Sequence, residues 1–208
     1  MRLLEPRTSV NKMSERRASI SRKTKETEVS VTLDLEGKGE VECEVGISFL
    51  EHMLQQLAFH ARFDLRLLAS GASAADYHHL VEDVGICLGQ ALAQALGEKK
   101  GIARYGWAVV PFDEALVLAA VDMSGRAFCQ VRLELGAEKV GDFDVEVVED
   151  FWRALAVNGR FALHIVEFAG RNTHHKVEAA FKAVGRALAT AVALEAGREG
   201  VPSTKGVL

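Results

Sequence analysis

The 208-residue chain is short of the features that mark several common classes of protein. It has three cysteines, three prolines and a formal net charge of −4. Three widely spaced cysteines without a Cys-x-x-Cys pair predict neither a disulfide framework nor a thiolate zinc site. A pI near 6.0 leaves no basic excess of the kind that nucleic-acid-binding domains carry, so no nucleic-acid partner is expected.

The chain also lacks a long hydrophobic run. No apolar segment approaches the roughly 18 residues that span a bilayer, and the N-terminus lacks the residue order of a signal peptide. We therefore expect no membrane association and a cytoplasmic location. Hydrophobic residues are nevertheless abundant, at 49% of the chain, which is typical of a protein that buries a core.

Regular hydrophobic periodicity begins only after residue 20, so residues 1–20 are expected to form a disordered leader. Residues 29–45 then alternate between apolar and polar about a turn at residues 36–39, which predicts a β-hairpin. The pair Ser48 and Glu51 predicts a capping box at the start of the helix that follows. The chain therefore begins its ordered part with strands and then a helix.

The same order of elements occurs twice. A further strand, and a helix that follows Asp76 and ends at Gly97, complete a β-β-α-β-α unit over residues 21–97. Residues 98–195 repeat this unit, and residues 196–208 form a C-terminal tail. The predicted fold class is α+β, a tandem duplication in which each unit forms a mixed sheet with two helices packed on one face.

The duplication is visible in the residues that carry chemistry. Three of them recur after 96 residues: His78, His79 and Glu82 correspond to His174, His175 and Glu178. His52 and Asp150 occupy matching places in the earlier helix of each unit, 98 residues apart. A role in packing alone does not require His-His-x-x-Glu twice, and burying polar groups without partners is costly. We interpret the repeated pattern as a metal-binding pattern.

Helix geometry indicates how these ligands divide. Successive residues of an α-helix turn by about 100°, so His78 and Glu82 share a face while His79 points to the side. Each His-His tandem is therefore expected to serve two ions, with further ligands from the other unit or another subunit. A shell of imidazole and carboxylate suits manganese, iron, zinc or nickel, and octahedral geometry favours manganese. The predicted metal ligands are His52, His78, His79, Glu82, Asp150, His174, His175 and Glu178.

A cation follows one of these ligand patterns. Lys182 lies one helical turn after Glu178, and a cation beside a metal site typically holds an anionic substrate group. Arg104, Arg126 and the hydroxyl and lysine residues at 202–206 offer further contacts to a phosphate. Taken alone, solvated surface arginines and a frayed C-terminus are the more common explanations of these last features.

At this point several ordered motifs give the chain a specific resemblance to a known family. They are Arg22–Thr27 (RKTKET), Phe49–Leu54 (FLEHML), His78–Asp83 (HHLVED), Pro111–Glu114 (PFDE), Ser124–Arg126 (SGR), Gly170–Glu178 (GRNTHHKVE), Phe181–Ala183 (FKA) and Ser203–Gly206 (STKG). From about residue 20 to its end, the chain resembles imidazoleglycerol-phosphate dehydratase, the lyase of histidine biosynthesis.

The resemblance implies a reaction and a set of roles. The implied reaction dehydrates D-erythro-imidazole glycerol phosphate to imidazole acetol phosphate, with two manganese ions per active site. It further implies a homo-oligomer of 24 subunits with the ions at subunit contacts, and Glu26 as the acid/base. Asp150 stands where many members have a ligating histidine, so its coordination stays open. The implied substrate contacts are Gln56, Arg104, Arg126, Lys182, Ser203 and Lys205.

Two other functions fit part of the same pattern. A binuclear metallohydrolase acting on a phosphate ester would share the ions and the cations but would release inorganic phosphate. A metal-storage or metal-sensing shell would bind the ions without needing Lys182 or a phosphate clamp in the tail.

Overall fold

The computed structural model describes residues 16–71, 77–141 and 143–208, so most of the predicted leader and Asp76 lie outside the described residues. Its first unit forms a four-stranded sheet of order β1-β2-β4-β3. The strands are β1 (Arg17–Lys23), β2 (Thr27–Asp34), β3 (Val41–Glu44) and β4 (Asp64–Gly71). β1, β2 and β4 pair antiparallel, and β3 joins β4 in parallel.

This pairing corrects two details of the sequence analysis. The predicted hairpin over residues 29–45 is wrong, because β4 lies between β2 and β3. Alternation along the chain reveals that two strands exist, but their hydrogen-bond partners are set by non-local packing. The leader boundary at residue 20 is also too late, since β1 begins at Arg17. Polar residues on the outer face of β1 hide its periodicity from the sequence.

The second unit repeats the first. β5 (Tyr105–Phe112), β6 (Ala115–Asp122), β7 (Phe128–Arg132) and β10 (Ala162–Ala169) form a sheet of order β5-β6-β10-β7, again with one parallel pair. A short pair, β8 (Lys139–Val140) and β9 (Phe143–Asp144), precedes its first helix. The predicted α+β tandem duplication is confirmed, with one strand more in each four-stranded sheet than the alternation had indicated, and with the β8–β9 pair in addition.

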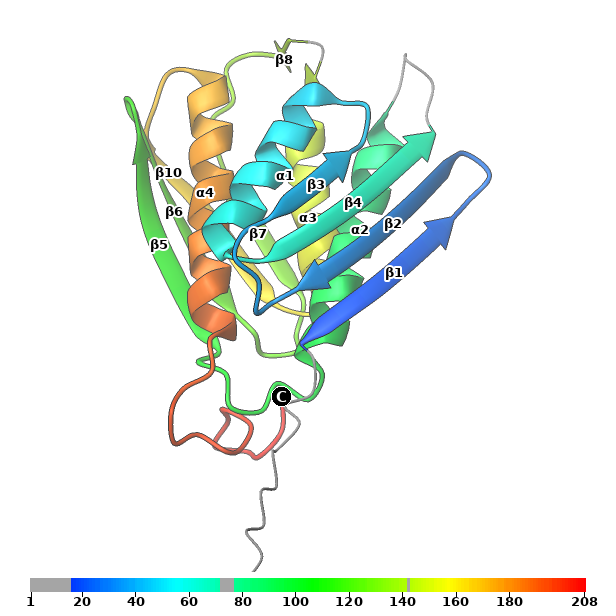
Figure 1. Ribbon diagram of the computed structural model, residues 1–208. Helices are drawn as coiled ribbons and strands as arrows, with labels where there is room; N and C mark the ends of the chain where they lie inside the picture. Colours follow the sequence, from blue (N-terminus) through cyan, green and yellow to red (C-terminus); the bar gives the residue numbers. More distant parts are fainter. Residues whose placement is uncertain (1–15, 72–76, 142) are drawn as a thin grey trace, which may run out of the picture.

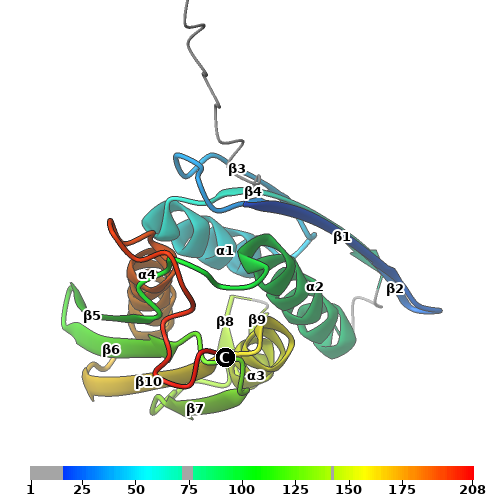
Figure 2. The same ribbon diagram turned by 90° about the horizontal axis from the view of Figure 1, so that it is seen from below.

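The helices of the described residues lie between the two sheets (Figure 1), so the layers run sheet, helices of the first unit, helices of the second unit, sheet (Figure 2). They are α1 (Ser48–Ala61), α2 (His78–Leu96), α3 (Val147–Gly159) and α4 (Thr173–Val192). Each helix packs against one from the other unit, α1 against α4 and α2 against α3. The duplication therefore folds as one body in which both helix contacts join the two repeats.

Glycines permit these helix contacts. Gly89 and Gly185 are repeat counterparts, 96 residues apart. A Cβ at Gly89 would lie 2.6 Å from the Leu155 carbonyl oxygen, and one at Gly185 would lie 2.5 Å from that of Leu57. Both distances are too short for a side chain, so the helix backbones approach this closely only because these positions are glycine.

The start of α1 differs from the predicted capping box. Ile47 occupies the N-cap and no side chain caps the helix, so Ser48 does not play its expected part. Glu51 does reach back, since its Oε1 accepts hydrogen bonds from the backbone N–H groups of Val45 (2.7 Å) and Gly46 (2.8 Å). The carboxylate thus fixes the turn between β3 and α1.

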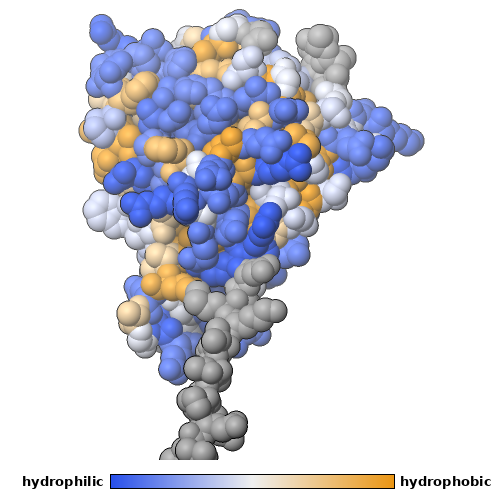
Figure 3. All heavy atoms as spheres, viewed as in Figure 1, coloured by the Kyte–Doolittle hydropathy of each residue, from blue (hydrophilic) through white to orange (hydrophobic). Residues whose placement is uncertain are grey.

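Polar side chains cover most of the surface over the first sheet (Figure 3). In the part of the chain that the structure describes, no helix has both the length and the apolar character needed to cross a bilayer.

Candidate metal and substrate site

The helices that carry the His-His tandems begin at the same end of the molecule (Figure 1). Asn172 caps α4, because its side-chain oxygen accepts hydrogen bonds from the backbone N–H groups of His174 (2.9 Å) and His175 (3.4 Å). Such a cap stabilises a helix by about 1 kcal/mol. It also fixes the first turn of α4, and with it the directions of the two imidazoles.

Three predicted ligands meet where α1 packs on α4. The donor atoms of His52, His174 and Glu178 all lie within 4.8 Å of one another. The Oε2 atom of Glu178 is 3.1 Å from His174 Nε2 and 3.4 Å from His52 Nε2. We call these three residues the Glu178 trio. The trio takes one histidine from the first unit and two ligands from the second, as predicted for a site between repeats.

Glu178 is held as a carboxylate. Its side chain is only 7% exposed, and Lys182 Nζ lies 2.8 Å from its Oε1. Burial acts to raise the pKa of Glu178, but the hydrogen bond and charge of Lys182, with smaller contributions from His174 and His52, outweigh burial and lower it. Lys182 also lies over the ring of Phe112, 3.8 Å from its centroid. The trio is therefore an anionic centre with a cation on its inner side.

A second, more open cluster lies where α2 packs on α3. His78 Nε2 is 3.8 Å from Asp150 Oδ2, and Glu82 follows His78 by one turn on α2. We call His78, Glu82 and Asp150 the Asp150 trio. It is the repeat counterpart of the Glu178 trio, with an aspartate in the place of His52.

The two remaining imidazoles point away from the trios, as helix geometry predicted. His79 Nδ1 is 2.8 Å from Glu26 Oε2, and His175 Nδ1 is 2.7 Å from Glu114 Oε2. Asp113 Oδ2 lies 3.7 Å from the other ring nitrogen of His175. No role was predicted for Glu114 from the sequence, although a comparison of the two β-turns at an offset of 88 residues pairs it with Glu26.

The turn that carries Glu26 is anchored to α2 through Asp83. This buried carboxylate accepts hydrogen bonds from Arg22 Nε (2.6 Å) and the Thr27 hydroxyl (2.5 Å). Thr24 continues the network, because its hydroxyl lies 2.9 Å from that of Thr27 and accepts from the Glu26 N–H at 3.1 Å. The backbone of the turn is thus fixed while the Glu26 side chain stays exposed.

The donor chemistry of the trios fits a divalent transition metal. Both consist of imidazole nitrogens and carboxylate oxygens, a combination that suits manganese, iron, zinc or nickel. No cysteine belongs to the cluster of donor atoms that the described residues form, and burial raises the pKa of Cys43 to about 12 and those of Cys87 and Cys129 to about 11. The thiols therefore stay protonated at neutral pH.

The predicted phosphate contacts fall into two places. Arg104 lies at the C-terminal end of α4, where its N–H donates to the Ala191 carbonyl (2.8 Å) and its Nη1 to that of Pro202 (2.8 Å). A Cβ on Gly125, the neighbour of Arg126, would lie 3.0 Å from the carbonyl carbon of Leu208. Arg104 and the Arg126 turn thus lie against the tail that carries Ser203 and Lys205. Lys182 instead lies inside the helix layer, beside the Glu178 trio.

These two places are far apart within one chain. His174 and Ala191 are separated by seventeen residues of α4, which corresponds to about 25 Å at the helical rise. Within one chain, the tail residues Ser203 and Lys205 therefore lie too far from the trios to share a small substrate with them. Gln56, the remaining predicted substrate contact, lies half-buried on α1, one turn after His52.

The two other histidines of the chain lie outside the trios. His164 lies in β10, where its ring is tilted by 33° against that of Phe128 with 5.2 Å between the centroids. His60 lies at the end of α1, where burial and then the charges of Lys182 and Arg186 lower its pKa. Neither belongs to a trio.

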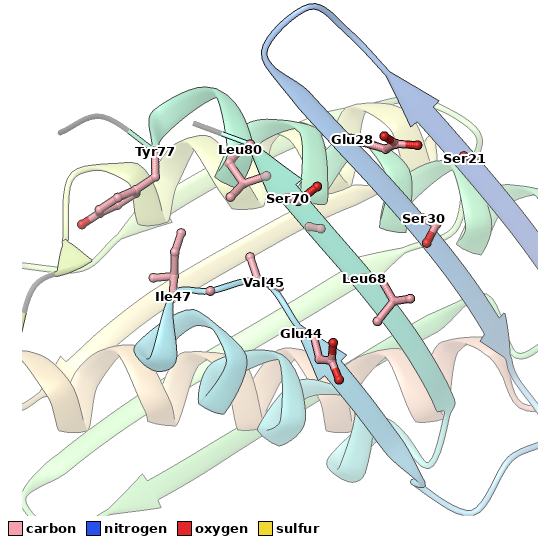
Figure 4. Close-up of a pocket in the computed structure, with 13 residues that line it drawn as sticks. Ser21, Glu28, Ser30, Glu44, Val45, Ile47, Leu68, Ser70, Tyr77 and Leu80 are labelled. Atoms are coloured by element: carbon pink, nitrogen blue, oxygen red, sulfur yellow. The ribbon is translucent and has the colours of Figure 1, made fainter. Parts of the chain in front are cut away.

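A pocket of about 750 Å³ opens at the end of the first sheet (Figure 4). It is bordered by hydroxyl groups, by the carboxylates Glu28 and Glu44, and by Tyr77 at the start of α2. Its lining contains no imidazole and neither glutamate of the trios. We therefore locate the chemistry at the Glu178 trio, where three donor atoms converge, and at its repeat counterpart, and not in this hollow.

Fold and site together define a class of enzymes with a duplicated α+β fold, in which imidazole and carboxylate side chains from both repeats meet where the helices pack. The family model for imidazoleglycerol-phosphate dehydratase matches residues 45–188. The chain belongs to this family of dehydratases in histidine biosynthesis.

Similar proteins agree over nearly the whole chain. The imidazoleglycerol-phosphate dehydratase of Pelotomaculum thermopropionicum is 53% identical over 196 residues, which cover 94% of this chain and 100% of that relative. That of Symbiobacterium thermophilum is 50% identical, with 97% of each chain covered. The crystal structure of the Staphylococcus aureus enzyme has a TM-score of 0.79 at 37% identity, covering 86% of this chain and 99% of that one. The Pyrococcus furiosus enzyme, in complex with (S)-C348, also has a TM-score of 0.79, at 38% identity, covering 91% of this chain and 100% of that one.

Proposed function

We propose that this enzyme dehydrates D-erythro-imidazole glycerol phosphate to imidazole acetol phosphate in the cytoplasm, with two manganese ions in each active site. The observation that carries the proposal is the convergence of His52, His174 and Glu178, whose donor atoms lie within 4.8 Å of one another. The Asp150 trio supplies the ligands of the second ion. Bound manganese would supply Lewis-acid stabilisation of negative charge on the substrate's imidazole ring, worth several kcal/mol.

Glu26 is suited to move the protons of this reaction. The reaction breaks a C–O bond at the carbon next to the ring and a C–H bond at the next carbon, so water leaves. The remaining enol becomes a ketone when a proton reaches the carbon next to the ring. The Glu26 carboxylate is 64% exposed and contacts His79, which places it beside the predicted ligands. A positioned carboxylate of this kind contributes about 10²- to 10⁴-fold to the rate.

The phosphate group of the substrate requires cations near the trios. Lys182 supplies one within the chain, while Arg104, Arg126, Ser203 and Lys205 lie at the other end of α4. Because a chain cannot bring both ends of one helix to the same small substrate, we propose that the tail of one subunit completes the site of another. The active site would then lie between subunits of a homo-oligomer, as the resemblance implies with 24 subunits.

The outer face of the second sheet supports self-association. The register of the four strands aligns their outward-pointing side chains in three rows across the sheet. These rows include the apolar residues Tyr105, Trp107, Val109, Leu118 and Phe128. The repeat counterparts on the first sheet are polar: positions 17, 19 and 21 hold Arg, Ser and Ser where the second unit has Tyr, Trp and Val. The helices lie only on the inner side of this second sheet (Figure 2).

The area of this apolar face is substantial. Tyr105, Trp107 and Phe128 are 58%, 68% and 50% exposed. Since an aromatic side chain can bury about 150–250 Å², these three leave roughly 350 Å² uncovered. One partner in a stable interface buries about 800 Å² in all. Three side chains thus offer nearly half of what a stable contact with a second copy needs.

We expect Trp107→Glu to break up the assembly, because it places a charge in the apolar face at its most exposed aromatic residue. Sedimentation velocity should give wild-type protein a mass of many times 22.6 kDa and the variant a much smaller one. Ser19→Glu, at the repeat counterpart on the polar sheet, is the matched control and should leave the mass unchanged. A wild-type monomer, or a Trp107→Glu particle of wild-type mass, would rule out this face.

The proposed reaction is tested by its products. We expect purified, manganese-loaded protein to convert imidazole glycerol phosphate to the ketone, detected by its absorbance in alkali or by NMR, without release of inorganic phosphate. Phosphate release without ketone would identify a metallohydrolase instead. Manganese binding without either product would favour a storage or sensing role.

A further inference from the structure

The β-turns of the two units carry corresponding glutamates. β1 and β2 align with β5 and β6 at a constant offset of 88 residues, and this offset places Glu114 at the position of Glu26. The two imidazoles that they contact, His79 and His175, are themselves repeat counterparts. The duplication has therefore preserved the whole pair, a turn glutamate and the second histidine of a tandem.

The same two atom types form the hydrogen bond in both pairs. The distance from glutamate Oε2 to histidine Nδ1 is 2.8 Å in the first unit and 2.7 Å in the second. An ionised carboxylate only accepts hydrogen bonds, so the proton of each imidazole lies on Nδ1. This leaves Nε2 with a free electron pair, which is the form in which a histidine binds a metal.

The surroundings of the two glutamates differ. Glu114 Oε1 accepts hydrogen bonds from the backbone N–H groups of Asn172 (2.8 Å) and Arg171 (3.2 Å), which precede α4. The bond from Asn172, followed by that from His175, lowers the pKa of Glu114 to about 2. The Glu114 side chain is 31% exposed against 64% for Glu26. Across the described residues, His79 provides the one hydrogen-bond partner of the Glu26 carboxylate.

We propose that Glu114 is a positioning residue, which fixes the tautomer and orientation of His175 for metal binding, while its repeat counterpart Glu26 keeps the freedom to transfer protons. This rests on the proposed function, because it assigns His175 to a manganese ion. One carboxylate oxygen of Glu114 accepts hydrogen bonds from the backbone just before α4, and the other is hydrogen-bonded to the imidazole of His175. Carboxylates that hold a ligating histidine in this way typically account for 10- to 100-fold in metal affinity.

Glutamine at position 114 separates this role from simple support of the fold. In Glu114→Gln the amide oxygen can still accept from Asn172 and Arg171, so the backbone contacts survive. The amide NH₂ group then faces His175 and donates to Nδ1, which moves the ring proton to Nε2 and blocks the metal-binding nitrogen. Position 26 has no such backbone contacts, so in Glu26→Gln the amide can rotate to present its oxygen to His79.

The experiment compares manganese affinity and histidine tautomers in Glu114→Gln, Glu26→Gln and wild-type protein. By isothermal titration calorimetry, we expect Glu114→Gln to bind one of the two ions 10- to 100-fold more weakly and Glu26→Gln to bind both with wild-type affinity. Nitrogen-15 spectra of metal-free, histidine-labelled protein should show one ring changing from the Nδ1–H to the Nε2–H form in Glu114→Gln only.

Unchanged manganese affinity and unchanged histidine spectra in Glu114→Gln would overturn the assignment. Failure of the proposed function would look different, because wild-type protein would then bind no manganese or form no ketone. The tautomer measurement uses metal-free protein and no substrate, so it decides the role of Glu114 in either case.

Discussion

Replacing Glu26 with glutamine is expected to lower kcat by about 10²- to 10⁴-fold, the range that a positioned acid/base contributes. Glutamine has nearly the same shape, and it can still accept the hydrogen bond from His79. It cannot take up or release a proton, however, so the step at the substrate side chain slows. Steady-state kinetics of ketone formation measure the loss, and elemental analysis should find the wild-type manganese content.

Glu42→Gln is a suitable control for this experiment. Glu42 is an exposed glutamate on β3 whose partner is Arg66, at 3.0 Å, and it lies outside the proposed site. We expect its kcat to equal that of the wild-type enzyme. If Glu26→Gln turned over substrate at the wild-type rate, Glu26 would have no part in proton transfer.

The sequence predicted which histidine and carboxylate side chains lie together better than it predicted the sheets. The repeat offset of 96 residues paired the two tandems, and the offset of 98 paired His52 with Asp150. These residues lie on helices, where spacing determines which side chains share a face. The structure accordingly brings His52 to the second tandem and Asp150 to the first.

Glu114 was missed for a definable reason. β1 and β2 align with β5 and β6 at an offset of 88 residues, whereas α1 and β4 align with α3 and β10 at 98, and the helices that carry the tandems, α2 and α4, align at 96. The offset grows because the second unit inserts additional residues, including β8 and β9, between its third strand and its first helix. A search at the offset of the tandems therefore pairs Glu26 with Asp122 and not with Glu114. The position of β3 was missed because the partner of a strand depends on contacts distant in sequence, here with β4.

The second large effect is expected at the Glu178 trio. Glu178→Ala removes the carboxylate that lies within 3.4 Å of both histidines and leaves the ammonium group of Lys182 without its anionic partner. An uncompensated cation beside the trio repels a divalent ion, so we expect bound manganese to fall from two ions per chain to one. Ketone formation should fall by at least about 10³-fold, because the Lewis-acid stabilisation that the lost ion would supply is worth several kcal/mol.

Glu149→Ala is the matched control for metal content. Glu149 lies next to Asp150 on α3, but its side chain is 56% exposed and pairs with Arg153. We expect this variant to keep two manganese ions and wild-type turnover. Two ions bound by Glu178→Ala would exclude Glu178 from the ligands.

The central claim is that ligands from both repeats meet in two trios, each of which contributes to binding one manganese ion. Anomalous diffraction at the manganese edge, from crystals of wild-type protein and of Glu178→Ala grown with manganese, tests it directly. The account predicts two peaks per wild-type chain, one at His52, His174 and Glu178 and one at His78, Glu82 and Asp150, and loss of the first peak in the variant. Peaks away from these residues, or none, would contradict it.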